Sequence, residues 1–475
     1  MPPNPNTPGH PIPRRAFLGG SALGLGSVAL AELLAANSAQ AAAPARTHAR
    51  PRAKNVIFLF MSGAPSQVDL FDPKPELARR AGEPVPESFL AGLADSLIKG
   101  STRLMPSPRT FSRHGRCGMQ FSDFLPELGS CADDLCMVRS MHTSVSNHDP
   151  AQLLMNCGVP QFGHPSMGSW VTYALGSESA NLPGYVVLLS NSGEGVDGGA
   201  ALWHNGFLPS SYRGVTFRSK GDAILNLSSP PGVAPESQKD RIETIVSLNR
   251  FRQGARPDPE IGSRIRAYEL AARMQLAAPE LLDLSQESES TREAYGLGSE
   301  TTRWFGTHCL LARRMVERGV RFVQLYHSTW DDHSDLNRKL RTNTAMTDRP
   351  AAALIRDLKQ RGMLDDTLVI WGGEFGRTPM TEVRRGMVAG KEGRDHHAFG
   401  FTMLLAGGGI RGGQVIGRTD ELGYHATEDR IHVHDLQATL LHCLGLDHLR
   451  LTYRHEGRDF RLTDVGGQVV DKLLG

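Results

Sequence analysis

The sequence predicts an α/β fold with a doubly wound, mostly parallel central sheet, because short apolar runs alternate with helical segments along the chain. Two of the clearest apolar runs lie at 54–60 and 367–371, and a helical segment at 351–361 precedes the second. A buried parallel strand that follows a crossover helix has this pattern. Ligands bind beyond the carboxyl ends of such strands, so the residues after each run are the first candidates for a site.

The other elements are expected from the same periodicities. Further strands are predicted at 135–141, 185–189, 321–326, 401–405 and 414–417. Helices are predicted at 121–132, 150–157, 167–175 and 434–444. The charged, largely helical stretch 237–317 indicates a helical insertion or flank within a single domain at 54–475.

A glycine-rich stretch, Gly407–Gly412, formally matches the G-x-G-x-x-G pattern of dinucleotide sites. That pattern requires a helix directly after the glycines, whereas Gln414–Ile416 has the composition of a strand. We therefore expect a glycine-rich hairpin here and no dinucleotide site.

The composition is that of an ordinary globular protein: 475 residues, 40% hydrophobic, 21% charged, with a formal net charge of +2. This balance gives no reason to expect a nucleic-acid partner. The six cysteines include no C-x-x-C pair, so no cysteine metal site is expected. Cys117, Cys131 and Cys136 are close enough in sequence to pair, whereas Cys443 lies in an apolar helical run typical of a buried thiol.

The first 41 residues are predicted to be a twin-arginine export signal. Arg14 and Arg15 precede a weakly apolar, glycine- and alanine-rich run, and Ala39–Ala41 offers a small-residue cleavage site. A membrane anchor is the alternative, but the run is short and is interrupted by Glu32.

A linker rich in alanine, proline and arginine at 42–53 joins the signal to the domain, and no later segment approaches membrane-spanning length. We therefore expect the twin-arginine machinery as a partner, no stable membrane span, and a periplasmic or otherwise extracytoplasmic protein.

Two strand ends carry candidate metal ligands. Trp330 to His333 follows one strand and supplies Asp331, Asp332 and an imidazole, which are O and N ligands suited to divalent ions. A helix N-cap with a surface histidine is the alternative. Glu374 follows the next strand beside three glycines that would let a substrate approach, and Arg377 could grip an anionic oxygen or pair with Glu374.

The strongest cluster is Asp395-His396-His397, just before the strand at 401–405. A histidine that binds a metal is commonly oriented by a neighbouring carboxylate, which Asp395 could supply to His396. A solvated polar loop is the alternative.

A third segment lies between a strand end and a helix start and contains Ser144, Ser146 and His148. Backbone N–H groups at a helix start can hold an anion, and a hydroxyl there could act as nucleophile. From these residues alone, an N-cap for the following helix is favoured.

Several motifs resemble the exported domain-of-unknown-function family numbered 1501, placed in the alkaline phosphatase and sulfatase superfamily. They include MSGAPSQVDLFDPKP, WDDHSDL, GGEFGRTPM and GRDHHAFGFTMLLAGGGIRGG, and the resemblance covers nearly all of the chain after the signal. It implies an alkaline-phosphatase-like three-layer sandwich and metal-assisted hydrolysis of phosphate or sulfate esters.

The resemblance also implies roles for individual residues. Asp331, His333, Glu374 and His396 match positions of metal ligands, and Ser144–His148 is similar in position to the nucleophile segment. The first strand ends in Met61-Ser62-Gly63 where an aspartate ligand is expected, so only Asp69 could stand in. The Cys/Ser-x-Pro-x-Arg pattern of sulfatases is absent.

The sequence therefore leads to an exported, metal-dependent hydrolase of sulfate or phosphate esters, with an anionic small-molecule or polysaccharide ester as substrate and Zn²⁺ or Ca²⁺ as the ion. The expected ligands are Asp69, Asp331, His333, Glu374, Asp395 and His396, and the expected catalytic residues are Ser146, His148 and Arg377. The alternative is a non-catalytic protein of the same fold that binds a sulfated or phosphorylated polymer.

Overall fold

The computed structural model describes residues 47–90, 102–190, 196–217, 235–255, 259–382 and 388–475. The expected signal sequence and the first part of the linker lie outside these residues. Within them, no helix combines the length and the apolar character needed to cross a membrane. All six cysteines are free thiols; Cys117 is exposed and the other five are buried.

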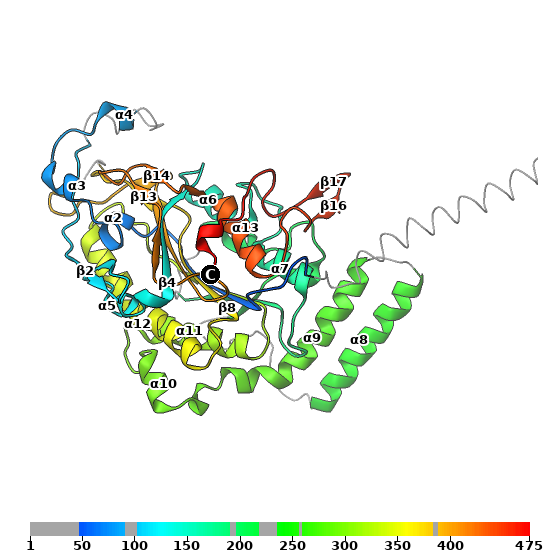
Figure 1. The fold of residues 1–475 in the computed structure, drawn as a ribbon. Helices are drawn as coiled ribbons and strands as arrows, with labels where there is room; N and C mark the ends of the chain where they lie inside the picture. The colour runs from blue at the N-terminus through cyan, green and yellow to red at the C-terminus, as the bar shows by residue number, and fades with distance from the viewer. Residues whose placement is uncertain (1–46, 91–101, 191–195, 218–234, 256–258, 383–387) are drawn as a thin grey trace, which may run out of the picture.

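Nine strands of the described residues form one central sheet (Figure 1). They are β1 Asn55–Met61, β4 Leu135–His142, β5 Tyr185–Leu189, β6 Val215–Phe217, β7 Phe322–His327, β8 Thr367–Gly372, β11 Phe401–Ala406, β12 Gln414–Ile416 and β15 Ile431–His432. The order is β12-β4-β11-β8-β1-β7-β5-β6, and β15 pairs with β4 beyond β12. These positions agree with the seven predicted apolar runs, each of which is a strand within one or two residues.

One central strand runs against the others. β11 is antiparallel to both of its neighbours, β4 and β8, while every other pairing in the sheet is parallel. The start of β11 therefore lies at the same edge of the sheet as the ends of β4, β8, β1 and β7. β11 also joins two groups of strands: β12, β4 and β15 on one side, and β8, β1, β7, β5 and β6 on the other.

The expected glycine-rich hairpin is wrong, because β12 does not pair with β11. It crosses to the far side of β4 and runs parallel to that strand. Gly407, Gly408 and Gly409 all have positive φ, and a Cβ on Gly407 would meet the main-chain oxygen of Leu364 at 2.1 Å. The glycines are needed for this tight exit from the sheet, which the sequence pattern alone does not distinguish from a hairpin.

The sheet lies between two helical layers, as Figure 1 shows. Alternate residues of β1 divide between the two cores: Ile57 and Leu59 face one, and Phe58 and Phe60 face the other. The first core is covered by α5 Pro126–Ser130, α11 Arg303–Glu317 and α12 Leu336–Gln360. The second is covered by α6 His148–Cys157, α7 Met167–Leu175 and α13 Val433–Cys443. This arrangement is the predicted three-layer α/β sandwich.

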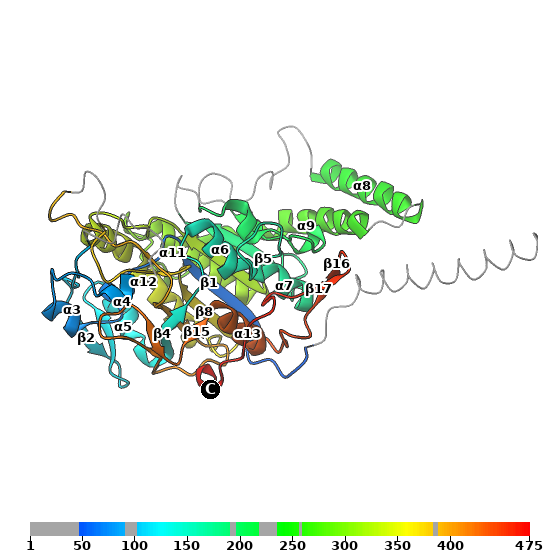
Figure 2. The same cartoon turned by 90° about the horizontal axis from the view of Figure 1, so that it is seen from above.

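The described residues of the stretch predicted as a helical insertion or flank form four α-helices. α8 Pro235–Ala255 packs alongside α9 Pro259–Leu282 at one end of the molecule (Figures 1 and 2), and α10 Glu289–Ala294 leads to α11. α11 belongs to the sandwich itself, because it packs on β7 and α12.

The helix predicted at 121–132 is wrong in its first part. Residues 119–122 form β3, which pairs with β2 Phe111–His114, and the helix α5 begins only at Pro126. Proline is favoured in a first helical turn because its missing N–H needs no partner there.

Short elements complete the described fold. Those near the site are α2 Gln67–Leu70 and the pair β9 Gly376–Arg377 and β10 His396–His397. The others are α3 Pro75–Arg79, α4 Glu87–Leu90, β13 Arg418–Thr419, β14 Ala426–Glu428, β16 Tyr453–His455, β17 Arg458–Phe460 and the 3-10 turns Ala132–Asp134, Gly199–Trp203, Ser210–Tyr212, Leu284–Gln286 and Asp471–Leu473.

Candidate metal centre

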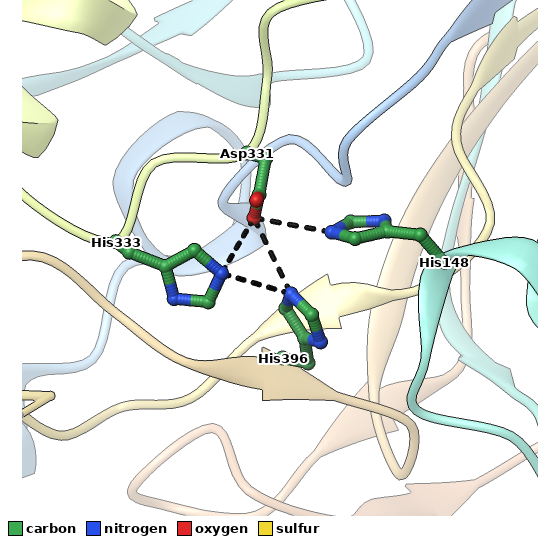
Figure 3. Close-up of side chains that lie close together, drawn as sticks. All are labelled: His148, Asp331, His333 and His396. Carbon is green, nitrogen blue, oxygen red and sulfur yellow. Dashed lines mark hydrogen bonds and ion pairs between the residues drawn. The ribbon is translucent and has the colours of Figure 1, made fainter. Parts of the chain in front are cut away.

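Four side chains from three segments meet at the edge of the sheet where β4, β7 and β8 end and β11 begins (Figure 3). His148 is the first residue of α6, which follows β4. Asp331 and His333 follow β7, and His396 lies in β10, directly before β11. Their ligand atoms all lie within 4.8 Å of one another.

The carboxylate of Asp331 is at the middle of this group. Its Oδ1 lies 3.1 Å from His148 Nε2, 2.8 Å from His333 Nε2 and 3.3 Å from His396 Nε2. His333 Nε2 also lies 3.0 Å from His396 Nε2. Figure 3 shows the three rings directed at the same carboxylate oxygen from different sides.

The other nitrogen of each ring contacts an acceptor. The acceptors are Glu374 Oε1 for His148 at 2.7 Å, the main-chain oxygen of Ser146 for His396 at 2.8 Å, and Glu382 Oε2 for His333. A neutral imidazole that donates its Nδ1–H in this way keeps the Nε2 lone pair available to an ion. The same partners fix the orientation of each ring.

Close packing of the main chain fixes the position of Asp331. Gly63 has a φ of +108°, and a Cβ there would meet the main-chain nitrogen of Asp331 at 2.4 Å. Thr329 also has a positive φ, +81°, and is held by two hydrogen bonds with the amide of Asn343. A β-branched residue in this conformation is strained, and strain of this kind collects at functional sites.

Arg377 also contacts the carboxylate of Asp331. Its guanidinium is buried, and it donates to Asp331 Oδ1 at 2.5 Å and to the main-chain oxygens of Gly63, Ala64, Trp330 and Arg394. The residue expected to hold an anion therefore positions Asp331 and the surrounding loops instead.

The charges of the centre shift several pKa values. Burial by itself would raise the pKa of Asp331, but its contacts with the three histidines and with Arg377 outweigh this effect and hold it well below its usual range. Burial by itself would lower the pKa of His148, but the carboxylates of Asp331 and Glu374 raise it to about 9. The centre therefore strongly favours positive charge beside Asp331.

A small divalent ion fits the donor atoms. Ligands about 2.0 Å from a tetrahedral ion lie about 3.3 Å from one another. The three distances from Nε2 atoms to Asp331 Oδ1 and the distance between the Nε2 atoms of His333 and His396 are 2.8–3.3 Å. His148 Nε2 is buried and has no aligned hydrogen-bond partner in the described part of the chain, although Asp331 is near. A ring nitrogen in this situation suits coordination better than hydrogen bonding.

Three of the residues expected as ligands do not belong to the group of four around Asp331. Glu374 is buried and accepts from His148, from Gln152 Nε2 at 3.0 Å and from the Gly63 N–H at 3.0 Å. Asp395 Oδ1 lies 4.0 Å from His333 Nδ1, on the side of the ring away from Asp331. There His333, Glu382 and Asp395 form a second group whose ligand atoms lie within 4.8 Å of one another.

Asp69 belongs neither to the four residues around Asp331 nor to the group of His333, Glu382 and Asp395. Its buried carboxylate pairs with Arg394 at 2.8 and 3.3 Å and accepts from Ser66 Oγ at 2.5 Å. Its oxygens are thus already satisfied by a guanidinium and a hydroxyl.

Two residues of the centre were missed in the sequence. Gln152 lies one turn after His148 on α6 and donates to both Ser62 Oγ and Glu374, and this spacing of four residues could have revealed it. Glu382 comes from the loop after β9 and reaches His333 only through the tertiary fold, so no local signal points to it.

A cavity of about 950 Å³ opens beside the centre, and Asp331 forms part of its wall. The Asp331 side chain is 43% exposed, the largest exposed fraction among the four residues. The Asp331 carboxylate is therefore accessible from the cavity side.

Solved structures show only a distant likeness to the chain. The lipoteichoic acid synthase LtaP from Listeria monocytogenes is 9% identical, with a TM-score of 0.38 and coverage of 92% of this chain and 80% of that one. The PsFucS1 sulfatase from Pseudoalteromonas sp. is 13% identical, with a TM-score of 0.33 and coverage of 92% and 72%. A TAB5 alkaline phosphatase mutant with Mg bound is 12% identical, with a TM-score of 0.31 and coverage of 75% and 92%.

Likeness at this level carries no information about activity. No curated protein matches the sequence. One family model, described as "Protein of unknown function (DUF1501)", matches residues 53–474. The match covers the whole sandwich and every residue of the centre, and the chain belongs to this family.

Proposed function

We propose that the protein is a divalent-metal-dependent hydrolase of phosphate or sulfate esters and that its sandwich belongs to the alkaline phosphatase superfamily. One observation carries the proposal. Three imidazoles, each with its Nδ1 held by an acceptor, direct their Nε2 atoms at one oxygen of Asp331 in the wall of a large cavity.

His148, Asp331, His333 and His396 are the proposed ligands. Three nitrogens and one oxygen suit Zn²⁺ or a similar transition metal, whereas Ca²⁺ is bound by six to eight oxygens. When bound, a divalent ion supplies Lewis acidity towards an ester oxygen and lowers the pKa of a hydroxyl or water.

The remaining residues of the centre act on these ligands. Glu374, Glu382 and the Ser146 carbonyl hold the three rings in the tautomer that leaves Nε2 unprotonated. Arg377 and Gly63 keep Asp331 in place. A rigid arrangement of this kind reduces the reorganisation needed when charge develops on a substrate.

Ser146 is the proposed nucleophile. It is exposed, and its main-chain oxygen contacts His396, so the residue lies next to the centre. The N-cap of α6 is Asn147, which makes no side-chain capping bond. This supports a role other than capping for the segment and leaves the N–H groups of the first turn of α6 near the site.

The proposal can be tested on protein stripped of metal and reloaded with Zn²⁺ or Ca²⁺. Zinc-loaded protein is expected to bind one ion at the centre and to hydrolyse para-nitrophenyl phosphate or para-nitrophenyl sulfate. His333→Ala should abolish turnover, and Ser146→Ala should lower kcat by orders of magnitude at unchanged metal content, with Ser144→Ala as the matched control. Equal kcat in the two serine variants would exclude Ser146.

A non-catalytic binding protein is the second candidate, and one observation favours it. The guanidinium of Arg377 is fully engaged with Asp331 and main-chain oxygens, so it is not available to hold a leaving anion. Zinc-loaded protein that binds both esters but turns over neither would support this candidate and contradict the hydrolase.

Export by the twin-arginine route is also proposed, on the basis of Arg14-Arg15 and Ala39–Ala41. N-terminal sequencing of protein from the extracytoplasmic fraction should give a chain that starts at or near residue 42. A chain that still begins at Met1, or protein confined to the cytoplasm, would contradict this proposal.

A further inference from the structure

The cavity beside the centre has a polar inner wall. It lies beyond the ends of β1 and β7 and is bordered by the first turns of α11 and α12. Ser190, His327 and Asp332 line it and are 4%, 1% and 1% exposed. Asp331 lines the same space, so a molecule in the cavity would also contact the metal centre.

These three side chains have unused hydrogen-bonding capacity. Within the described residues, Ser190 Oγ, both ring nitrogens of His327 and both carboxylate oxygens of Asp332 have no hydrogen-bond partner. Lys339 Nζ lies 3.9 Å from Asp332 Oδ1. Buried polar groups without partners cost free energy, so their collection on one cavity wall points to a ligand that satisfies them.

The chemistry of the wall indicates which ligand this is. Asp332 accepts hydrogen bonds, Ser190 donates and accepts, and burial lowers the pKa of His327 to about 3, so its neutral ring offers one donor and one acceptor. Hydroxyl groups match all of these needs. A second metal ion does not, because the described groups that could hold an ion include neither Asp332 nor His327.

An aromatic ring completes the cavity. Trp304, in the first turn of α11, lines it and is 43% exposed. Its ring makes no stacked or edge contact with another aromatic ring of the described chain. A flat apolar face beside a few convergent polar groups is the usual composition of a site for a small organic ligand.

We propose that this cavity binds a polyhydroxylated ring, such as a sugar or a cyclic polyol, with one face against Trp304 and its hydroxyl groups bonded to Asp332, His327 and Ser190. The inference rests on the proposed function, because the ring would be the alcohol part of the ester whose anionic group reaches the centre. Trp304 and Asp332 then determine specificity and take no part in the chemical step.

Calorimetric titration of the zinc-loaded protein with methyl glucopyranoside and with myo-inositol tests the inference without any turnover. At least one of these polyols should bind, whereas propanol should not. Trp304→Ala should weaken binding about tenfold or more, and Trp304→Phe should weaken it less, because a smaller ring retains part of the contact. Asp332→Asn should also weaken binding, since a site built to bond hydroxyls depends on each polar group.

Tyr268→Ala is the matched control, because Tyr268 is 42% exposed on α9 but does not line the cavity. The inference is overturned if neither polyol binds, or if Trp304→Ala and Asp332→Asn bind as tightly as the control. Para-nitrophenyl esters separate the two proposals. Polyol binding without ester hydrolysis would overturn the hydrolase alone, and hydrolysis without polyol binding would overturn this inference alone.

Discussion

Asp331 and Asp69 both lie beyond the carboxyl end of a central strand, and both contact a buried arginine, but their surroundings differ. Asp69 is 1% exposed, and Arg394 and Ser66 use both of its oxygens. The Asp331 side chain is 43% exposed and shares one oxygen among three imidazoles. One carboxylate is neutralised within the protein, and the other faces nitrogens that need a cation between them.

This difference separates a structural carboxylate from a candidate metal ligand. A guanidinium satisfies a carboxylate permanently, because arginine is always protonated. Arg377 also contacts Asp331, but an imidazole can exchange its proton for a metal ion, so the three ring nitrogens around the Asp331 oxygen are satisfied only when a proton or an ion is present. Four changes test the contrast, in order of decreasing effect.

Removal of a ligand should have the largest effect. In His148→Ala one of the four donor atoms is lost, and the affinity for Zn²⁺ should fall by more than about 100-fold. This loss exceeds that expected when a residue that only orients a ligand is changed. Elemental analysis after dialysis measures this, together with the melting temperature with and without zinc. His455→Ala, in the β16–β17 hairpin, is the control. A His148→Ala protein that keeps one tightly bound ion would remove the residue from the ligand set.

Breaking the ion pair between Asp69 and Arg394 should lower the stability of the fold and leave metal binding unchanged. Arg394→Met leaves the charge of Asp69 buried without a cation, and the free energy of unfolding should fall by about 3–5 kcal/mol. The double variant with Asp69→Leu should recover much of this loss, because no unpaired charge remains. Lys54→Met, which breaks an exposed pair with Asp366, should leave the melting temperature unchanged. Loss of zinc in the double variant at unchanged fold would place Asp69 in the centre after all.

A change of Glu374, which contacts His148 Nδ1, should have an intermediate effect on zinc affinity. Glu374→Gln keeps an acceptor but removes its charge, so zinc affinity should fall by about 10–100-fold. In metal-free protein the His148 pKa, raised to about 9 by Asp331 and Glu374 against the effect of burial, should fall, as an NMR titration would measure. An unchanged pKa would show that Asp331 alone sets it.

The raised pKa of His148 also makes the stability of the metal-free protein depend on pH. A folded-state pKa above the unfolded value of about 6.5 stabilises metal-free protein fully below pH 6.5, and this stabilisation is lost as the pH rises towards 9. Chemical unfolding of metal-free protein at pH 6 and pH 9 should show a smaller difference in Glu374→Gln than in the unmodified protein.

Asp395→Asn should have the smallest effect of the four. Asp395 lies 4.0 Å from His333 Nδ1, while Glu382 already contacts that nitrogen. Such a partly exposed pair contributes about 0–1 kcal/mol, so zinc affinity should change by less than about fivefold. A loss as large as that of His148→Ala would make Asp395 a direct ligand.

The sandwich could be predicted because its signals are local. Each apolar run, such as the one that became β1, carries its own periodicity and length, and these decide the element type. The order and direction of the strands depend on contacts between distant segments. Nothing within Phe401–Ala406 itself indicates that β11 runs against β4 and β8.

For the candidate site, the sequence likewise indicated several of the residues but not their arrangement. Asp331, His333 and His396 stand out because strand ends collect polar residues. His148 was expected beside the nucleophile and Glu374 on the ion, and the structure shows a closer arrangement, in which Glu374 holds His148 and His148 faces Asp331. The direction of a ring nitrogen is set by its partners in space, which spacing along the chain does not encode.

The central place of β11 has a consequence for the order in which the molecule forms. Until Phe401–Ala406 inserts between β4 and β8, the two groups of strands share no edge. His396 belongs to the segment that leads into this strand and meets a carbonyl 250 residues earlier in the chain. Contacts of such long range form slowly and late. Binding of the proposed metal ion would therefore follow the completion of the sheet, and a nascent chain that ends before β11 would not yet have the assembled centre.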